Sequence, residues 1–174
     1  MKKLLLFAGT ILAAASAGRA QDTPKAELSA SYSFLREGGN DGINSNGGSI
    51  SFAGNLNRWA GLVGDFGAYH AAPFGAGLNT YTFLVGPRFT YRKPAGIQPF
   101  VQVLVGGAHL TASAGGVSDA ISGFAYSAGG GIDLGFSKRM AIRPQIDYIG
   151  IRSNGNTLNN VRASVGVVFR FGSR

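Results

Sequence analysis

The sequence predicts an all-β protein, an eight-stranded antiparallel up-and-down β-barrel that spans a membrane with its apolar face toward lipid. Three observations predict this fold. First, 28 of the 174 residues are glycine, which disfavours a mainly helical chain because glycine costs roughly 0.5–1 kcal/mol relative to alanine inside a helix. Second, apolar and polar residues alternate with a period of two along most of the chain, as they do in β-strands. Third, eight such stretches are separated by turn-rich sequence.

The composition excludes several other classes of protein. The chain has no cysteine, and only 14% of its residues are charged. The lack of cysteine excludes a disulfide scaffold, a thiol enzyme, a cysteine zinc site and a lipidated N-terminal cysteine. The low charge excludes long coiled coils and acidic disordered tails. The length suits a single domain.

Residues 1–20 have the pattern of a secretory signal peptide. Lys2 and Lys3 precede an apolar run over 4–15, and small residues follow it, as in cleaved signal peptides. We expect cleavage after Ala20, with cleavage after Ala17 as the alternative; a membrane anchor is disfavoured because the run is shorter than the ~20 residues of a spanning helix. The remaining barrel domain, 21–174, holds 13 basic and 8 acidic residues, a net charge near +5. These charges are too dispersed for a nucleic-acid interface.

The predicted strands follow from the alternation. They lie, in chain order, within residues 25–35, 49–56, 62–68, 80–91, 101–105, 124–136, 142–148 and 161–171. One face of each strand carries Val, Ile, Leu, Phe and Tyr, and the other face carries mostly Ser, Thr, Gly and Ala. Strands of about ten residues, rising ~3.3 Å per residue and tilted near 45°, cover roughly 23 Å, close to the apolar band of membrane barrels.

The connections between the strands alternate in length. The short ones lie at 57–58, 93–97 and 137–139, and the long ones at 36–48, 70–79, 111–123 and 153–160. Short turns at one end and long loops at the other are typical of bacterial outer-membrane barrels, in which the short turns face the periplasm. We therefore expect both ends of the mature chain on the periplasmic side and mobile long loops outside the cell.

The polar face decides which side of the barrel points outward. In a soluble barrel it would meet water and carry dense Lys and Glu, but here it has few charges. Aromatic residues near strand ends, such as Trp59 and Tyr91, match the interfacial belts of membrane proteins. We therefore predict the apolar face outside. The alternative is a secreted, soluble lipocalin-like barrel that binds a small apolar ligand inside.

Three prolines test the strand prediction, because a closed barrel has no free edge on which a missing N–H is harmless. Pro99 and Pro144 are expected at strand beginnings. Pro87 falls inside a predicted strand, where we expect a bulge or a loosened ladder.

Two segments near the end of the chain resemble a known family. The run 129–134, the turn 137–139 and the run 141–148 look like the penultimate hairpin of small outer-membrane β-barrel proteins similar to the OmpA transmembrane domain and OmpX. Residues 165–171, with Phe169 and Phe171, are similar to the C-terminal signal read by the outer-membrane assembly machinery, although Gly172–Arg174 follow the last aromatic residue here.

The resemblance implies a location and a set of partners. It implies a monomer in the outer membrane that contacts outer-membrane lipids, lipopolysaccharide and the assembly machinery. The roles it implies are envelope integrity, surface interaction through the long loops, or very limited permeation.

Few residues suggest chemistry of another kind. The glycines at 129–131 fit neither a dinucleotide fingerprint nor a P-loop, and we interpret them as room for bulky neighbours inside a narrow barrel. His70 and His109 are the two histidines, and neither has further ligands at metal-site spacing, so no metal or cofactor is expected. A deacylase-like enzyme acting on lipid A would need an outward carboxylate beside His109 to activate a hydroxyl. None is evident, so we expect a non-enzymatic protein.

The predicted inward face carries charges of both signs in equal number. They are Glu27, Asp65, Asp133 and Asp147 against Arg88, Arg143, Arg162 and Arg170. Charges in so narrow an interior are costly unless they are paired. We expect Glu27, Arg170, Arg143 and Asp133 to form one belt near the short-turn end, with the pairs Glu27–Arg170 and Asp133–Arg143. Such a network would plug the lumen; the alternative is that these side chains only hydrogen-bond trapped water.

Overall fold

A computed structural model of the chain describes residues 23–38, 42–72, 77–92, 96–114, 117–153 and 155–172. The expected signal peptide and its cleavage site lie outside these residues. Within them, no helix is both long enough and apolar enough to cross a membrane.

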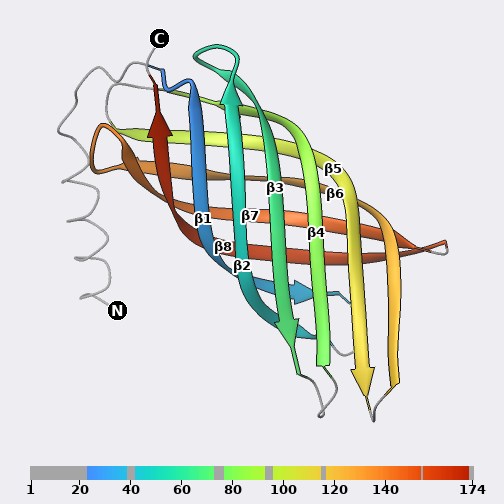
Figure 1. Cartoon of the computed structure of the whole chain (residues 1–174). Helices are drawn as coiled ribbons and strands as arrows, with labels where there is room; N and C mark the ends of the chain where they lie inside the picture. Colours follow the sequence, from blue (N-terminus) through green and yellow to red (C-terminus); the bar gives the residue numbers. More distant parts are fainter. Residues whose placement is uncertain are drawn as a thin grey trace.

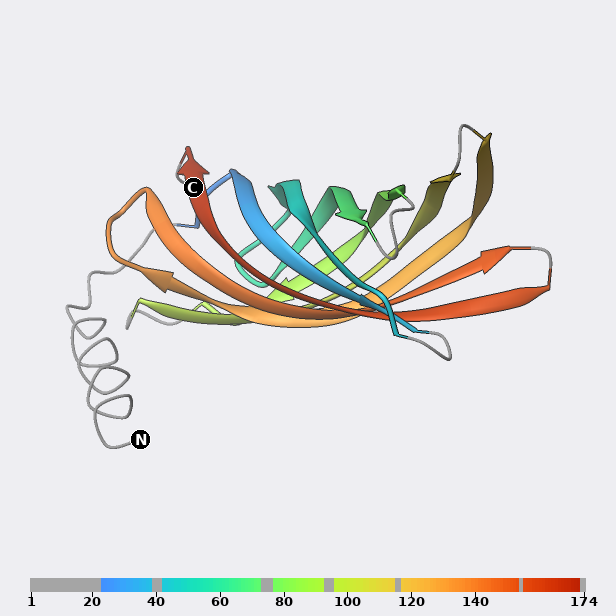
Figure 2. The ribbon, with the colours of Figure 1, turned by 90° about the horizontal axis from the view of Figure 1, so that it is seen from below.

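The described chain forms one closed barrel of eight strands (Figure 1). The strands are β1 (Ala26–Glu37), β2 (Asn44–Asn55), β3 (Ala60–Ala71), β4 (Gly77–Thr90), β5 (Ile97–Ala114), β6 (Val117–Gly135), β7 (Met140–Ser153) and β8 (Asn156–Phe171). Each strand pairs antiparallel with the next, and β8 closes the barrel on β1. The strands run obliquely around the barrel, as Figures 1 and 2 show. The predicted fold is therefore confirmed.

The short turns lie at the end of the barrel where the chain enters β1 and leaves β8. There Ala26 pairs with Phe171, and residues 56–59 and 136–139 connect β2 to β3 and β6 to β7. We call this the turn end, and the opposite end the loop end.

At the loop end two of the expected long loops are instead mostly strand. β5 continues to Ala114 before β6 begins at Val117, and β7 continues to Ser153 before β8 begins at Asn156. The expectation of long loops at 111–123 and 153–160 was therefore wrong. The physical reason is that ladder hydrogen bonds come from the backbone, so small polar residues extend a hairpin when each strand has a partner, as Thr111 does in Ala120.

The apolar face of the sheet points outward. Val103, Val165 and Phe83 are 57%, 52% and 57% exposed, whereas Arg143 and Arg162 are buried. This arrangement is the reverse of a soluble barrel, whose apolar residues fill the interior. The alternative of a secreted lipocalin-like barrel is therefore wrong, and the outer face is the lipid-contacting surface of a membrane barrel.

Two prolines interrupt the hydrogen-bonded ladder without shifting its register. On β4, Val85 pairs with Val105 and Arg88 with Gln102, so Gly86 and Pro87 are skipped with no extra residue on either strand. The ladder at Pro87 is thus loosened and not bulged.

Pro99 is the third residue of β5, near the strand beginning as expected. Pro144, in contrast, lies inside β7, and the β6–β7 register skips it. β8 still pairs with it. An antiparallel residue turns its N–H toward one neighbour only, so an interior proline weakens the ladder on a single side.

Candidate functional site

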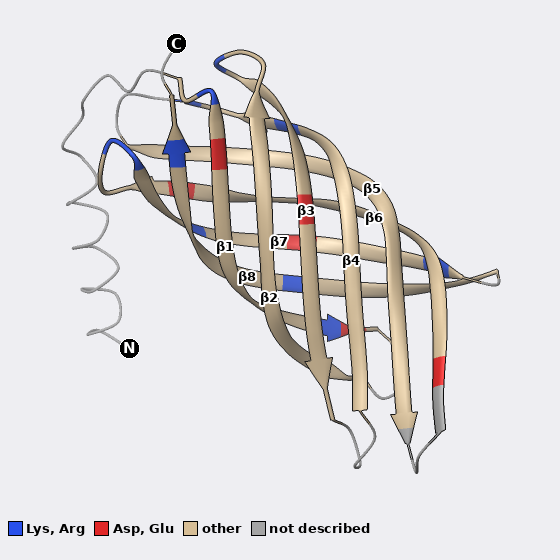
Figure 3. Cartoon of the chain, viewed as in Figure 1, with Lys and Arg blue, Asp and Glu red and all other residues tan. Residues whose placement is uncertain are grey.

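The inside of the barrel is the most chemically distinctive region of the molecule. All eight charged residues expected to point inward are buried: Glu27, Asp65, Arg88, Asp133, Arg143, Asp147, Arg162 and Arg170. They come from β1, β3, β4, β6, β7 and β8. Figure 3 shows that charged positions are sparse along the strands and more frequent toward the turn end.

The first cluster of charges lies near the turn end and is centred on Arg143. Its Nη2 donates to Glu27 Oε2 at 2.9 Å, and its Nε and Nη2 donate to the two oxygens of Asp133 at 2.5 and 2.8 Å. Arg170 Nη2 lies 3.3 Å from Asp133 Oδ2. The four residues of the expected belt are thus brought together, with Arg143 between the two carboxylates. The expected Asp133–Arg143 pair forms, but Arg170 pairs with Asp133 where Glu27 was expected.

A third arginine, Arg92, joins this cluster. Arg92 Nη2 lies 2.6 Å from Glu27 Oε1, and its side chain is 8% exposed. Asn55 also donates to Glu27 Oε1 at 3.1 Å. Arg92 lies one residue beyond the strand predicted within 80–91. The inward alternation of Arg88 and Thr90 would have identified it if it had been continued by two residues.

The second cluster lies further along the lumen and is centred on Arg162. Its Nη1 lies 2.8 Å from Asp65 Oδ1, and its Nη2 lies 2.8 Å from Asp147 Oδ2. Nη1 also donates to the Tyr69 hydroxyl at 3.0 Å. Asp65 belongs to β3 and Asp147 to β7, so one guanidinium ties together strands that are not neighbours in the sheet.

Neutral side chains connect the two clusters. Arg88 donates from Nε and Nη2 to Gln102 Oε1 at 3.0 and 2.9 Å, and Gln102 Nε2 donates to Asp147 Oδ1 at 3.1 Å. Arg88 Nη1 lies 3.8 Å from Glu27 Oε2. The Arg88 and Arg143 guanidinium groups both lie over the Phe100 ring, at 4.6 and 4.7 Å from its centroid. These distances are short enough for cation–π attraction.

Glycines on β6 make room for this network. A Cβ at Gly129 would collide with the Asp147 carboxylate, and one at Gly131 would lie 2.9 Å from the Phe100 ring. These contacts agree with the interpretation of the glycine run as space for bulky neighbours.

Apolar side chains pack among the charged and polar ones along the lumen, most of them toward the loop end. Leu104 and Val63 are 0% exposed, and Leu35 and Ile149 are 1% exposed. They belong to one buried cluster with Ala53, Tyr69, Leu84, Ala108, Ala125 and Ile151. We call this cluster the apolar layer. The Tyr69 hydroxyl accepts a hydrogen bond from Arg162, and the other side chains of the cluster have no polar group.

On the outer face, cross-strand polar pairs occur near the loop end. They are Tyr32–Asn46 at 3.0 Å, His70–Asn79 at 2.8 Å, His109–Ser122 at 2.9 Å and Tyr148–Asn159 at 2.6 Å. One pair lies in each hairpin that turns at this end. Aromatic rings with a polar tip favour the boundary between hydrocarbon and water, so these pairs mark that boundary around the barrel.

The surroundings of His109 bear on the enzyme question. Its Nδ1 lies 2.9 Å from Ser122 Oγ on the outer face. Asp119 pairs with Ala112 in the register, which places it on the opposite, inward face of the sheet from His109. Among the described residues, no group of three or more His, Asp or Glu side chains could hold a metal ion.

Comparisons with known proteins agree with this architecture. Residues 4–171 match the model of the outer membrane protein β-barrel domain family. No curated protein matches the sequence. Among solved structures, Neisserial surface protein A is similar with a TM-score of 0.75 at 13% identity, covering 84% of this chain and 97% of that one. Ail, the attachment invasion locus protein of Yersinia pestis, has a TM-score of 0.63 at 15% identity, covering 85% and 99%.

The N-terminal barrel of Pseudomonas aeruginosa OprF is similar as well, with a TM-score of 0.55 at 18% identity, covering 82% of this chain and 97% of that one. These likenesses concern the fold, which is the same small barrel. The family match spans nearly the whole sequence. The chain therefore belongs to the outer-membrane β-barrel protein family and is a protein of the outer membrane.

Proposed function

We propose that this protein is a non-enzymatic structural barrel of the outer membrane, with a plugged lumen, that contributes to envelope integrity. One observation carries the proposal: a continuous network of buried ion pairs and the apolar layer together occupy the inside of the barrel. An eight-stranded barrel has only enough interior for side chains to fill. A barrel filled in this way offers solutes no path.

The two parts of the filling block permeation in different ways. Arginines and carboxylates in the network hold one another at 2.5–3.3 Å, so a passing ion would have to break charge-assisted hydrogen bonds. The apolar layer offers an ion or a water molecule few polar partners, and burial of an unpaired charge there is strongly unfavourable.

Conductance measurements on the purified protein in planar bilayers test this function. We expect no stable openings from the wild-type protein, with an open porin as the positive control. The double variant Leu35→Ala and Leu104→Ala, which thins the apolar layer, should give at most brief openings because the charged network remains. Large, steady, ohmic openings of the wild-type protein would refute the plugged lumen.

The orientation and partners belong to the same proposal. The turn end faces the periplasm, as short turns do in bacterial barrels, and the protein acts as a monomer amid outer-membrane lipids and lipopolysaccharide after insertion by the assembly machinery. Because the natural chain lacks cysteine, Lys138→Cys at the turn end and Asn156→Cys at the loop end give clean labelling sites. A membrane-impermeant maleimide added to intact cells should label Asn156→Cys only; the reverse pattern would invert the orientation.

The deacylase-like alternative is disfavoured by the inward position of Asp119, which leaves His109 with a serine hydroxyl and no carboxylate in the register beside it. We expect the lipid A of cells producing the protein to keep all its acyl chains, as judged by mass spectrometry. Loss of an acyl chain that His109→Ala restores would establish the enzyme instead.

A second candidate function, surface interaction, rests on the β5–β6 hairpin. β5 and β6 remain paired out to Ala114 and Val117, whereas β6 first pairs with β7 at Phe124, so the hairpin projects beyond its β7 neighbour. Ail, which shares the fold, has been crystallised in complex with a heparin analogue, sucrose octasulfate. Host-cell adhesion of bacteria that produce the protein with or without residues 111–122 tests this role, and equal adhesion would argue against it.

A further inference from the structure

An apolar groove crosses the outer face of β1, β2 and β3. It is a shallow, open groove with a volume of about 540 Å³. Its outward lining residues are Ala30, Tyr32, Gly48, Ile50, Phe66 and Ala68. The groove exists because small residues alternate with large ones across the sheet: Gly48 pairs with both Tyr32 and Ala68, and Ile50 pairs with both Ala30 and Phe66.

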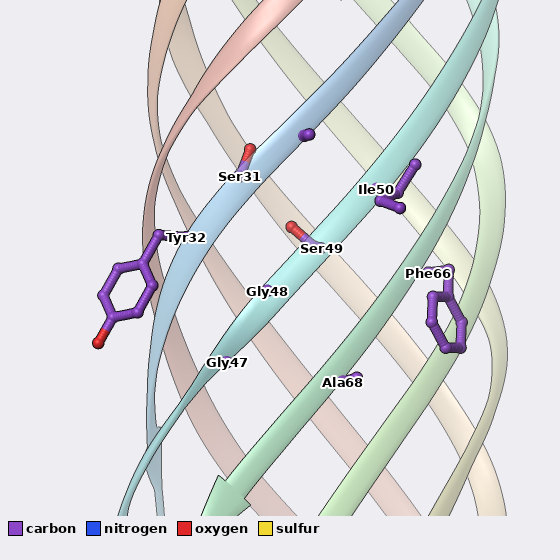
Figure 4. A pocket seen from close by; sticks show the side chains of 9 residues that line it. Ser31, Tyr32, Gly47, Gly48, Ser49, Ile50, Phe66 and Ala68 are labelled. Atoms are coloured by element: carbon purple, nitrogen blue, oxygen red, sulfur yellow. The ribbon is translucent and has the colours of Figure 1, made fainter.

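The walls of the groove are held in place by their neighbours. In Figure 4 the Tyr32 and Phe66 side chains project outward from the ribbon on either side of Gly48 and Ala68. Phe66 packs against Phe83 with ring centroids 4.8 Å apart, and the Tyr32 hydroxyl donates to Asn46 at 3.0 Å. Because these contacts already fix the Tyr32 and Phe66 side chains, a ligand that binds in the groove does not have to order them first.

The location of the groove selects the chemistry of its occupant. It lies in the outward face that contacts hydrocarbon, so the molecules available to fill it are membrane lipids. A saturated acyl chain is a slim apolar rod that fits between Tyr32 and Phe66 over a floor of small residues, where it gains dispersion contacts that a flat surface does not offer.

The loop end of the groove is polar and basic. Asn46, which holds the Tyr32 hydroxyl, lies opposite His70 in the register, and Asn44 lies opposite Arg36. The side chains of Asn44, Asn46, His70 and Arg36 are all exposed on the outer face. The nearest acid described on these strands, Glu37, points inward and accepts hydrogen bonds from Ser45 and Thr80. Arginine matches the geometry of a phosphate.

We propose that this groove holds one acyl chain of lipid A, the membrane anchor of lipopolysaccharide, with a lipid A phosphate at Arg36 and His70. The proposal rests on the proposed orientation, which places the loop end in the outer leaflet. His70 is the next outward residue after Ala68 on β3, and Arg36 lies beyond Phe34 on β1, so one phosphorylated acyl lipid can reach both the groove and these residues.

Photo-crosslinking tests the site. The wild-type protein is reconstituted in phosphatidylethanolamine vesicles with lipid A that carries a diazirine on its acyl chains, and cross-links are mapped by mass spectrometry. We expect several-fold more labelling at Tyr32, Ile50 and Phe66 than at Val103 and Val165, which face lipid elsewhere on the barrel. Equal labelling of the two sets would overturn the proposal.

Matched variants sharpen the test. Ala68→Leu fills the groove and should reduce its labelling to that of Val103, whereas Ala128→Leu, the same change on the outer face of β6, should leave it unaltered. Arg36→Gln with His70→Gln should lower the preference for lipid A over a phosphatidylglycerol competitor. An equal preference for phosphatidylglycerol in the wild type would refute lipid A as the occupant.

These outcomes are separable from failure of the proposed function. Bilayer conductance reports on the lumen and not on the groove. The maleimide experiment reports on orientation: an inverted barrel would overturn the leaflet assignment even if acyl chains still label the groove.

Discussion

The two halves of the lumen are filled by different kinds of side chain, and the difference shows what each kind contributes. From the turn end to the middle of the lumen, Arg143 and Arg162 each hold carboxylates from separate strands. Further toward the loop end, Leu35 and Ile149 pack with other apolar side chains, beside neutral polar groups such as Thr82. Charge-assisted hydrogen bonds are directional and bind particular strands together, whereas apolar packing is non-directional and excludes water. The charged side chains therefore determine which strands are held together, and the apolar side chains exclude water from the lumen.

The largest effect is expected from the centre of the second cluster. Arg162→Ala leaves Asp65 and Asp147 buried without their shared cation, and loss of one partner of a buried pair costs about 3–5 kcal/mol. Urea unfolding of the barrel in detergent micelles, followed by Trp59 fluorescence, measures the loss. Arg152→Ala is the matched control, because Arg152 is exposed on the outer face of β7, and its unfolding midpoint should hardly change.

A somewhat smaller loss is expected in the apolar layer. Leu104→Ala leaves a cavity at a fully buried position, which costs about 3 kcal/mol. Leu158→Ala, at a position that is 43% exposed, should cost far less in the same unfolding experiment. If the two variants lost equal stability, the lumen around Leu104 would not be packed as described.

The outer face provides the contrast to both halves of the lumen. Val103→Arg forces a charge into hydrocarbon and should destabilise the barrel in lipid vesicles by about 2–4 kcal/mol, whereas Leu56→Arg, in a short turn, should cost about 0–1 kcal/mol. We expect Val165→Arg and Phe83→Arg to behave like Val103→Arg. If arginine caused little loss of stability at all three positions, these side chains would not face lipid.

The smallest of these effects tests how tightly the charged half is packed. Gly129→Ala pushes a methyl group against the Asp147 carboxylate and against the backbone of Ile146 and Asp147, and overpacking of this kind costs about 1–3 kcal/mol. Gly64→Ala is the control, because a Cβ there meets nothing within 4 Å. Equal unfolding midpoints for the two variants would show that Asp147 has room to move.

Much of the fold was predictable because it depends on a local pattern. Alternation with a period of two identified eight strands and the correct face of each, and it placed Glu27, Asp65 and Arg162 inside. Loop length was less predictable, since segments rich in small residues such as 111–114 and 117–123 continue as strands when a paired neighbour supports them. The composition of such a segment does not reveal that support.

It was harder to predict which lumen side chains contact one another than to predict which residues point into the lumen. Arg162 reaches Asp65 across the barrel, and Gln102 links Arg88 to Asp147. Contacts across the lumen depend on strand tilt and stagger, which the order of residues along one strand does not disclose. Neutral groups such as Gln102 and Phe100 were missed because an amide or a ring has no charge to balance.

The closure of the barrel between β1 and β8 has a consequence for how the protein forms. Ala26 and Phe171, from opposite ends of the described chain, are partners in this seam. Without β8, both β1 and β7 would present unpaired backbone groups to hydrocarbon, where no water can satisfy them. Incomplete chains therefore have no stable resting state in the bilayer. Insertion becomes an all-or-none event that must wait for the last strand to be synthesised and delivered.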